Sequence, residues 1–279
     1  MMPKFGLTEL YRGEDPIVDV VAVHGLNGDP FKTWTTDGSN TIDNIWQSLF
    51  RAYSTTCTDA GCRAGSRPRA GGRDAAADHI HLPLAWWDIV KRAIAYSASR
   101  TSKSIQHVHS IYASTFAILF LGTPHDGNNK AKLASTSRRM VGALVPSKIV
   151  DTEGQLLDAL QEGSEVLQNI TDMFAPLMKD FHIFFFWEQE KTDMGFTLDY
   201  VVEESSAAPI LDSTERAGLP YNHRNMCKFE GRTSSGYRLV VAALIRYSKE
   251  APEVISGRWK YTISMLNSKR SQEADELLR

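Results

Sequence analysis

A glycine-containing loop follows the first apolar run of the chain and can present backbone amides to a reacting group. Residues 17–23 read IVDVVAV, and residues 24–28 read HGLNG. Glycines there let the backbone turn tightly and leave N–H groups directed at the adjoining crevice, as an oxyanion hole requires. The same pattern suits an ordinary turn after a strand, so the local sequence leaves both interpretations open.

Polar residues also follow two later apolar runs. Residues 116–121 (FAILFL) end at GTPHDG, which contains His125 and Asp126, and residues 181–187 (FHIFFFW) end at Glu188. Apolar runs of this length are typical of strands buried on both faces in a parallel sheet. Ligand sites in such sheets lie beyond the C-terminal ends of the strands. We therefore expect these polar residues along one edge of a sheet.

Residues 52–79 depart from this pattern, because Ala, Gly, Arg, Ser and Asp dominate their composition. Such a composition is typical of irregular, exposed chain. No aromatic residue is interleaved with its arginines to stack on bases, so we expect no nucleic-acid site. Cys57, Cys62, His79 and His81 follow no known ligand spacing, so we expect no metal site.

The overall composition is that of an ordinary globular protein. The chain has 279 residues, of which 42% are apolar and 23% charged, and its formal net charge is −2. This charge gives no general attraction to nucleic acid or to an anionic membrane. Three cysteines do not form a disulfide framework, and no apolar stretch approaches the ~20 residues of a membrane-spanning helix. We therefore expect an intracellular, cytoplasmic protein with no integral membrane segment and no cofactor. The sequence does not indicate its oligomeric state.

Amphipathic helical patterns lie between and after the apolar runs. Apolar residues recur at helical spacing within residues 89–98, 133–145, 156–178 and 237–247. Alternating strands and helices predict an α/β fold, with a mostly parallel sheet and helices on both faces. We assign residues 1–250 to a single domain of this class and residues 251–279 to a C-terminal helical extension.

Four motifs, in this order, resemble the serine-hydrolase branch of the α/β-hydrolase superfamily: VVAVHGLNGDPFKTWT, IYASTFAILFLGTPHDG, FFFWEQ and HRNMCKF. The closest group is the lipase-like, serine-active-site-containing family related to the GPI-inositol deacylases. Its fungal members also form N-terminal domains of larger signalling proteins. The resemblance covers about residues 17–247 and implies an α/β-hydrolase fold.

The resemblance implies a base and an oxyanion hole. His223 in HRNMCKF corresponds to the general base, and the backbone at Gly25 and Leu26 corresponds to the oxyanion hole. The implied reaction is hydrolysis of a small-molecule or lipid ester by acyl transfer to water. Some family members are associated with mitochondria or the endoplasmic reticulum. The resemblance therefore implies peripheral association with one of these organelles as the alternative to a cytoplasmic location.

The resemblance also implies an acid that orients the histidine. Glu188 at the end of FHIFFFW fits this role, and Glu203 and Glu204 are the alternatives. The GTPHDG loop is mainly structural in this family, so we assign no chemistry to His125 or Asp126.

The serine nucleophile that the resemblance requires is not found. No G-x-S-x-G occurs in the chain, and LPLAWW, residues 82–87, stands where the nucleophile elbow belongs. Two tryptophans and a proline cannot imitate that tight turn. Ser97 and Ser99 lie further along the next helix, and Ser234 follows His223, which is the wrong order. We therefore expect a partly truncated, impaired or inactive serine esterase, with a non-catalytic binding or signalling module as the alternative.

Residues 47–87 are too few for the strands and crossovers that this fold needs there, since each crossover unit takes ~30 residues or more. A shifted reading frame or a mis-spliced exon would explain this. Tryptophan has the single codon TGG, so Trp86 and Trp87 read Gly-Gly when the frame moves by one base, and permitted codons before them read Thr-Cys-His-Ser-Leu. A genuine, diverged pseudo-enzyme is the other explanation. Residues 52–80 are thus an irregular segment or an out-of-frame insert.

Overall fold

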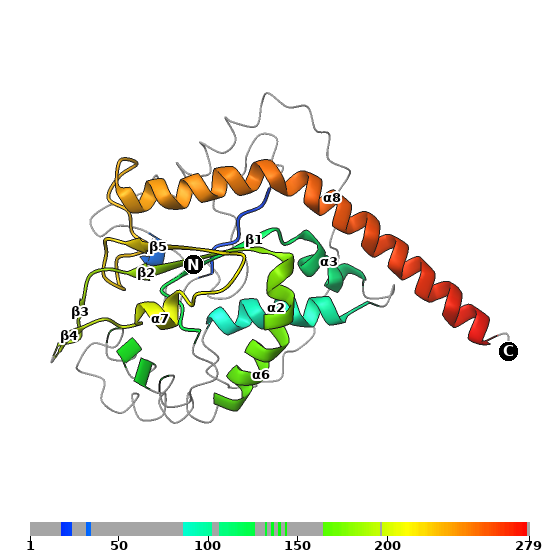
Figure 1. Cartoon of the computed structure of the whole chain (residues 1–279), viewed down its shortest axis with the longest axis horizontal. Helices are drawn as coiled ribbons and strands as arrows, with labels where there is room; N and C mark the ends of the chain where they lie inside the picture. Colours follow the sequence, from blue (N-terminus) through cyan, green and yellow to red (C-terminus); the bar gives the residue numbers. More distant parts are fainter. Residues whose placement is uncertain are drawn as a thin grey trace, which may run out of the picture.

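The computed structural model describes residues 18–23, 32–34, 86–101, 106–125, 132, 135–136, 139–140, 143, 164–195 and 197–277. The elements named in these ranges are shown in Figure 1: η1 (Lys32–Trp34), α2 (Trp86–Ser99), α3 (Gln106–Ser114), β1 (Ala117–Leu121), α6 (Ser164–Phe174), η3 (Ala175–Asp180), β2 (His182–Glu188), β3 (Thr192–Asp193), β4 (Leu198–Asp199), α7 (Glu204–Ala207), β5 (Thr214–Leu219) and α8 (Ser235–Leu277).

A three-stranded parallel sheet in the order β1-β2-β5 carries the candidate site. Its register pairs Leu121 of β1 with Phe186 of β2, and Glu188 at the end of β2 with Leu219 at the end of β5. The strands predicted within residues 116–121 and 181–187 are therefore confirmed as β1 and β2. Helices together with a parallel sheet make this an α/β arrangement.

Helices cover both faces of this sheet, as Figure 1 shows for α8 on one side and α2 and α6 on the other. Side chains alternate across a strand, so Phe184 and Phe186 of β2 join one core cluster, and Ile183 and Phe185 join another. The first cluster contains α8 residues such as Val240, and the second contains residues of α2 and α6. Burial on both faces explains why the β2 sequence is apolar without alternation.

The strand predicted over residues 17–23 is not observed. Residues 18–23 form no strand, and the side chain of Val21 is 65% exposed, while Val18 packs against the core cluster beside α8. An interior strand needs a neighbour that takes its backbone hydrogen bonds, and the described residues include no such neighbour for this segment. The prediction of a buried strand is therefore wrong for residues 18–23.

The predicted helices are largely present. Residues 89–98 lie within α2, and those of residues 133–145 that the structure describes are helical. Of the helix predicted over residues 156–178, the structure describes residues 164–178, which form α6 followed by the first part of the 3₁₀ helix η3; residues 156–163 lie outside the described residues. The change of helix type coincides with Pro176, because proline has no N–H to continue the α-helical hydrogen bonds.

Helix α8 is much longer than the helix predicted over residues 237–247. It is a single 43-residue helix that continues past residue 250 and contains Pro252. Pro252 cannot donate to the carbonyl of Ser248, which favours a bend at this point. Figure 1 shows α8 changing direction about midway. Within the described ranges no helix is both long and apolar enough to cross a membrane.

Candidate functional site

Glu188 and His223 meet beyond the C-terminal ends of β2 and β5. Glu188 is the last residue of β2, and His223 lies in the loop that follows β5. The Nδ1 atom of His223 is 3.5 Å from Oε1 of Glu188. The Glu188 side chain is fully buried, whereas that of His223 is 12% exposed. The two side chains that the family resemblance nominates are therefore neighbours, at a distance just beyond the ~2.6–3.2 Å of a formed hydrogen bond.

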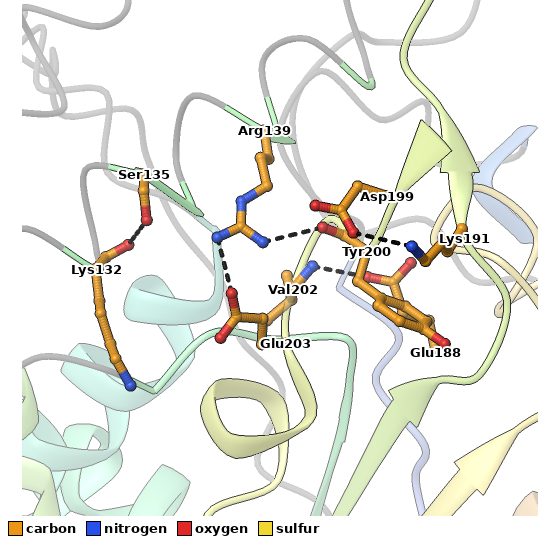
Figure 2. Close-up of polar contacts among 9 residues, drawn as sticks. All are labelled: Lys132, Ser135, Arg139, Glu188, Lys191, Asp199, Tyr200, Val202 and Glu203. Atoms are coloured by element: carbon orange, nitrogen blue, oxygen red, sulfur yellow. Dashed lines mark hydrogen bonds and ion pairs between the residues drawn. The ribbon is translucent and has the colours of Figure 1, made fainter. Parts of the chain in front are cut away.

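Backbone and hydroxyl donors hold the buried carboxylate of Glu188. The N–H of Val202 donates to Oε1 at 2.7 Å, a contact drawn in Figure 2. The hydroxyl of Thr192 donates to Oε2 at 3.4 Å. A buried carboxylate is costly unless such donors replace the lost water. This arrangement turns Oε1 toward both Val202 and His223.

Thr192 also contacts the histidine itself. Its hydroxyl oxygen accepts a hydrogen bond from the backbone N–H of His223 at 3.1 Å, and Thr192 is almost completely buried. Thr192 begins the short antiparallel β3–β4 hairpin, in which it pairs with Asp199. Sequence analysis did not single out Thr192 or Val202, because their contacts depend on how this hairpin folds back over the end of β2.

Gly122 forms the surface beneath the imidazole ring. It follows β1 directly and has a φ of 59°, a left-handed conformation that glycine adopts without strain. A Cβ atom there would lie 3.0 Å from Cε1 of His223 and 2.5 Å from Sδ of Met226. The glycine of the GTPH motif is thus required by backbone geometry and by the close approach of His223.

The alternative acids lie with other partners. Glu203 is bonded to Arg139 at 3.0 Å, and Glu204 to Arg216 at 3.0 Å. Both glutamate side chains are about half exposed. Figure 2 shows Arg139 between Glu203 and the carbonyl of Tyr200, apart from the carboxylate of Glu188. Glu188 is the acid that the structure records beside His223 in the described part of the chain.

The ring of His125 packs against the aromatic side chains of the core. Its ring lies edge-on to Phe120 and Phe185, with centroid separations of 4.8 Å in both cases. Burial, with a smaller contribution from the charge of Lys91, holds the pKa of His125 well below its ordinary value. His125 is therefore neutral near pH 7, in keeping with the structural role assigned to this loop.

The hydroxyls of Ser97 and Ser234 are engaged in hydrogen bonds with the backbone. Ser97 is fully buried; its hydroxyl donates to the carbonyl of Val108 at 2.6 Å and accepts from the N–H of Tyr112 at 2.8 Å. The Ser234 hydroxyl donates to the carbonyl of Gly231 at 2.8 Å. Among the described residues, no serine hydroxyl hydrogen-bonds to the His223 ring.

The thiol of Cys227 favours its neutral form. Cys227 lies four positions after His223 in HRNMCKF, and burial raises the pKa of its thiol to about 12. The reactive form of cysteine is the thiolate, which is nearly absent from such a thiol at neutral pH. In the ranges that the structure describes, no three His, Cys, Asp or Glu side chains gather where they would bind a metal ion.

Several predictions concern residues outside the described ranges. These are the predicted oxyanion-hole residues Gly25 and Leu26, the predicted irregular segment 52–79, and residues 82–85 of the LPLAWW sequence. Trp86 and Trp87 are the first two residues of α2.

Comparison with protein-family models, with curated proteins and with solved structures finds no match. The described site thus places the His223 ring beside the buried carboxylate of Glu188, and among the described residues no serine hydroxyl hydrogen-bonds to that ring.

Proposed function

We propose that this chain is an α/β-hydrolase-like protein with a serine-esterase-type site. In this proposal His223 is the general base, Glu188 is the acid that orients it, and the backbone at Gly25 and Leu26 is the oxyanion hole. The substrate class is an ester of a small molecule or lipid. Turnover by this chain is impaired, because its sequence contains no nucleophile elbow.

The observation that carries the proposal is the 3.5 Å approach of His223 to Glu188 at the C-terminal edge of a parallel sheet. A general base for acyl transfer needs an imidazole with one ring nitrogen facing an orienting carboxylate. Its other ring nitrogen must be open to the reactants. Here Glu188 is buried and His223 is partly exposed, as these two roles require. The chain order of acid before histidine also fits the α/β-hydrolase order.

A non-catalytic binding or signalling module is the second candidate. It is favoured by the sequence LPLAWW in place of the elbow and by the structural hydrogen bonds that occupy Ser97 and Ser234. In that case the site at His223 binds a ligand but lacks the group that would attack it.

A serine-directed fluorophosphonate probe tests the proposal, with His223→Ala as the base-deficient variant and His107→Ala as an exposed-histidine control. We expect no labelling of the unmodified chain. We expect covalent labelling when residues 47–87 are replaced by the in-frame family-like segment, and loss of that labelling in His223→Ala but not in His107→Ala. Absence of labelling in the restored chain, with p-nitrophenyl butyrate still bound, would favour the binding module and overturn the esterase proposal.

A further inference from the structure

The buried side chain of Thr192 hydrogen-bonds to both members of the Glu188–His223 pair. Its Oγ1 atom lies 3.4 Å from Oε2 of Glu188 and 3.1 Å from the backbone nitrogen of His223. Thr192 is 1% exposed, so water does not compete for these contacts. The residue comes from the β3–β4 hairpin, whereas the other two come from the sheet edge.

The chemistry of a hydroxyl gives these two contacts a direction. A backbone N–H can only donate, so the Thr192 oxygen accepts from His223. The single proton of the hydroxyl is then left to donate to Glu188, whose carboxylate can only accept when ionised. The two hydrogen bonds therefore form one chain, from the His223 backbone through Thr192 to Oε2 of Glu188.

This hydrogen-bond chain holds one oxygen of the carboxylate, while the histidine ring approaches the other. With Oε2 bound to Thr192 and Oε1 bound to the N–H of Val202, the carboxylate plane cannot rotate freely. Oε1 is thereby presented to Nδ1 of His223. Because the same hydroxyl also holds the His223 backbone, the acid and the base are positioned by one group.

We propose that Thr192 is a positioning residue that selects the Nδ1–H tautomer of His223 by orienting Glu188. This inference rests on the proposed function, since it assigns Glu188 and His223 their roles as acid and base. The tautomer matters because a base that accepts a proton at Nε2 must carry its resting proton on Nδ1.

The tautomer is measured directly by ¹⁵N–¹H side-chain NMR of the full chain, with His223→Ala to assign the His223 signal. We expect His223 to be mainly the Nδ1–H form in the unmodified chain. Thr192→Val, which keeps the shape but lacks the hydroxyl, should change the tautomer ratio by about fivefold, the effect of one net hydrogen bond. Thr192→Ser should restore the original ratio.

Thr197→Val is the matched control, because Thr197 is an exposed threonine in the same hairpin region. It should leave the ratio unchanged. An unchanged ratio in Thr192→Val, or a Thr192→Ser variant that behaves like Thr192→Val, would overturn the inference. If Thr192→Val does not fold, Thr192→Ala, which also lacks the hydroxyl, replaces it, and an unchanged ratio in Thr192→Ala would likewise overturn the inference. Because no step of ester chemistry is measured, failure of the proposed function leaves this result interpretable.

Discussion

Gly122 and His223 lie so close together that a Cβ atom on Gly122 would be 3.0 Å from Cε1 of the imidazole ring. The same Cβ atom would be 2.5 Å from Sδ of Met226, and the backbone of Gly122 has a positive φ. The end of β1 therefore sets the position of the histidine that follows β5. Any side chain at Gly122 must displace the ring or the backbone.

Replacing Gly122 by alanine should destabilise the protein by about 2–4 kcal/mol, from the strain of a positive φ and from overpacking against Met226. Urea unfolding measures this loss. Gly257→Ala is the control: a Cβ on Gly257, within α8, would have no neighbour within 4 Å, so alanine should stabilise by about 0.5–1 kcal/mol. Equal stability of Gly122→Ala and the unmodified chain would contradict the close approach.

Removal of the Glu188 side chain should be costly because it leaves the buried N–H of Val202 without its acceptor. We expect Glu188→Ala to lower the free energy of unfolding by about 1–3 kcal/mol. Glu203→Ala removes an exposed carboxylate that pairs with Arg139, so its effect should stay within about 1 kcal/mol. Denaturant titration of both variants checks this, and the reverse order of the two effects would rule out the buried position of Glu188.

Arg258 should anchor the second half of α8 to the body of the protein. Its guanidinium donates to the carbonyls of Tyr112 at 3.2 Å and Thr115 at 2.5 Å, and also to that of Asp180. Arg258→Met should cost about 1.5–3 kcal/mol, as for hydrogen bonds to a charged group, and should speed amide hydrogen exchange in this half of α8. Lys260→Met, at an exposed position on the same helix, should change neither quantity. Unaltered exchange in Arg258→Met would mean that the helix is held by other contacts.

His125 should make the protein sensitive to acid. Burial lowers its pKa in the folded state, so this contribution to stability is present above the unfolded pKa of about 6.5 and is lost as the pH falls. Below that pH the unfolded chain binds a proton at His125 that the folded chain does not. The free energy of unfolding therefore falls by up to about 1.4 kcal/mol for each unit by which the pH is lowered. His125→Phe should reduce this slope in urea titrations at pH 7 and pH 5, because a phenyl ring suits the site between Phe120 and Phe185. The exposed His107→Ala serves as control, and a slope unchanged by His125→Phe would count against burial as its cause.

Strands β1 and β2 and the polar residue Glu188 at the end of β2 could be predicted from local sequence patterns. The runs that form β1 and β2 are apolar on both faces, and the polar residue that ends such a run marks the C-terminal edge of the sheet. The family resemblance then supplied His223, which no local pattern distinguishes from a surface histidine. The spacing of residues alone would not have paired it with Glu188.

Other features depend on contacts that a sequence pattern does not contain. Residues 18–23 have the composition of a buried strand, yet the pattern cannot show whether a neighbouring strand is available, and the described structure has none. Thr192 reaches Glu188 only because two very short strands fold back as a hairpin. Helix α8 continues through Pro252, which sequence rules treat as a stop, because its tertiary contacts extend on both sides of the proline.

The most direct test of the account is the rate at which the purified chain hydrolyses short-chain p-nitrophenyl esters. We expect the unmodified chain to turn over these esters no faster than His223→Ala, because loss of the nucleophile lowers turnover by on the order of a millionfold in serine hydrolases. Restoring only Cys-His-Ser-Leu-Gly-Gly at residues 82–87 should not rescue activity, whereas replacing the whole segment from Gln47 should give turnover that requires both His223 and Glu188. Turnover by the unmodified chain that depends on His223 and is blocked by a fluorophosphonate would contradict the account, and would mean that a serine such as Ser97 or Ser234 serves as the nucleophile.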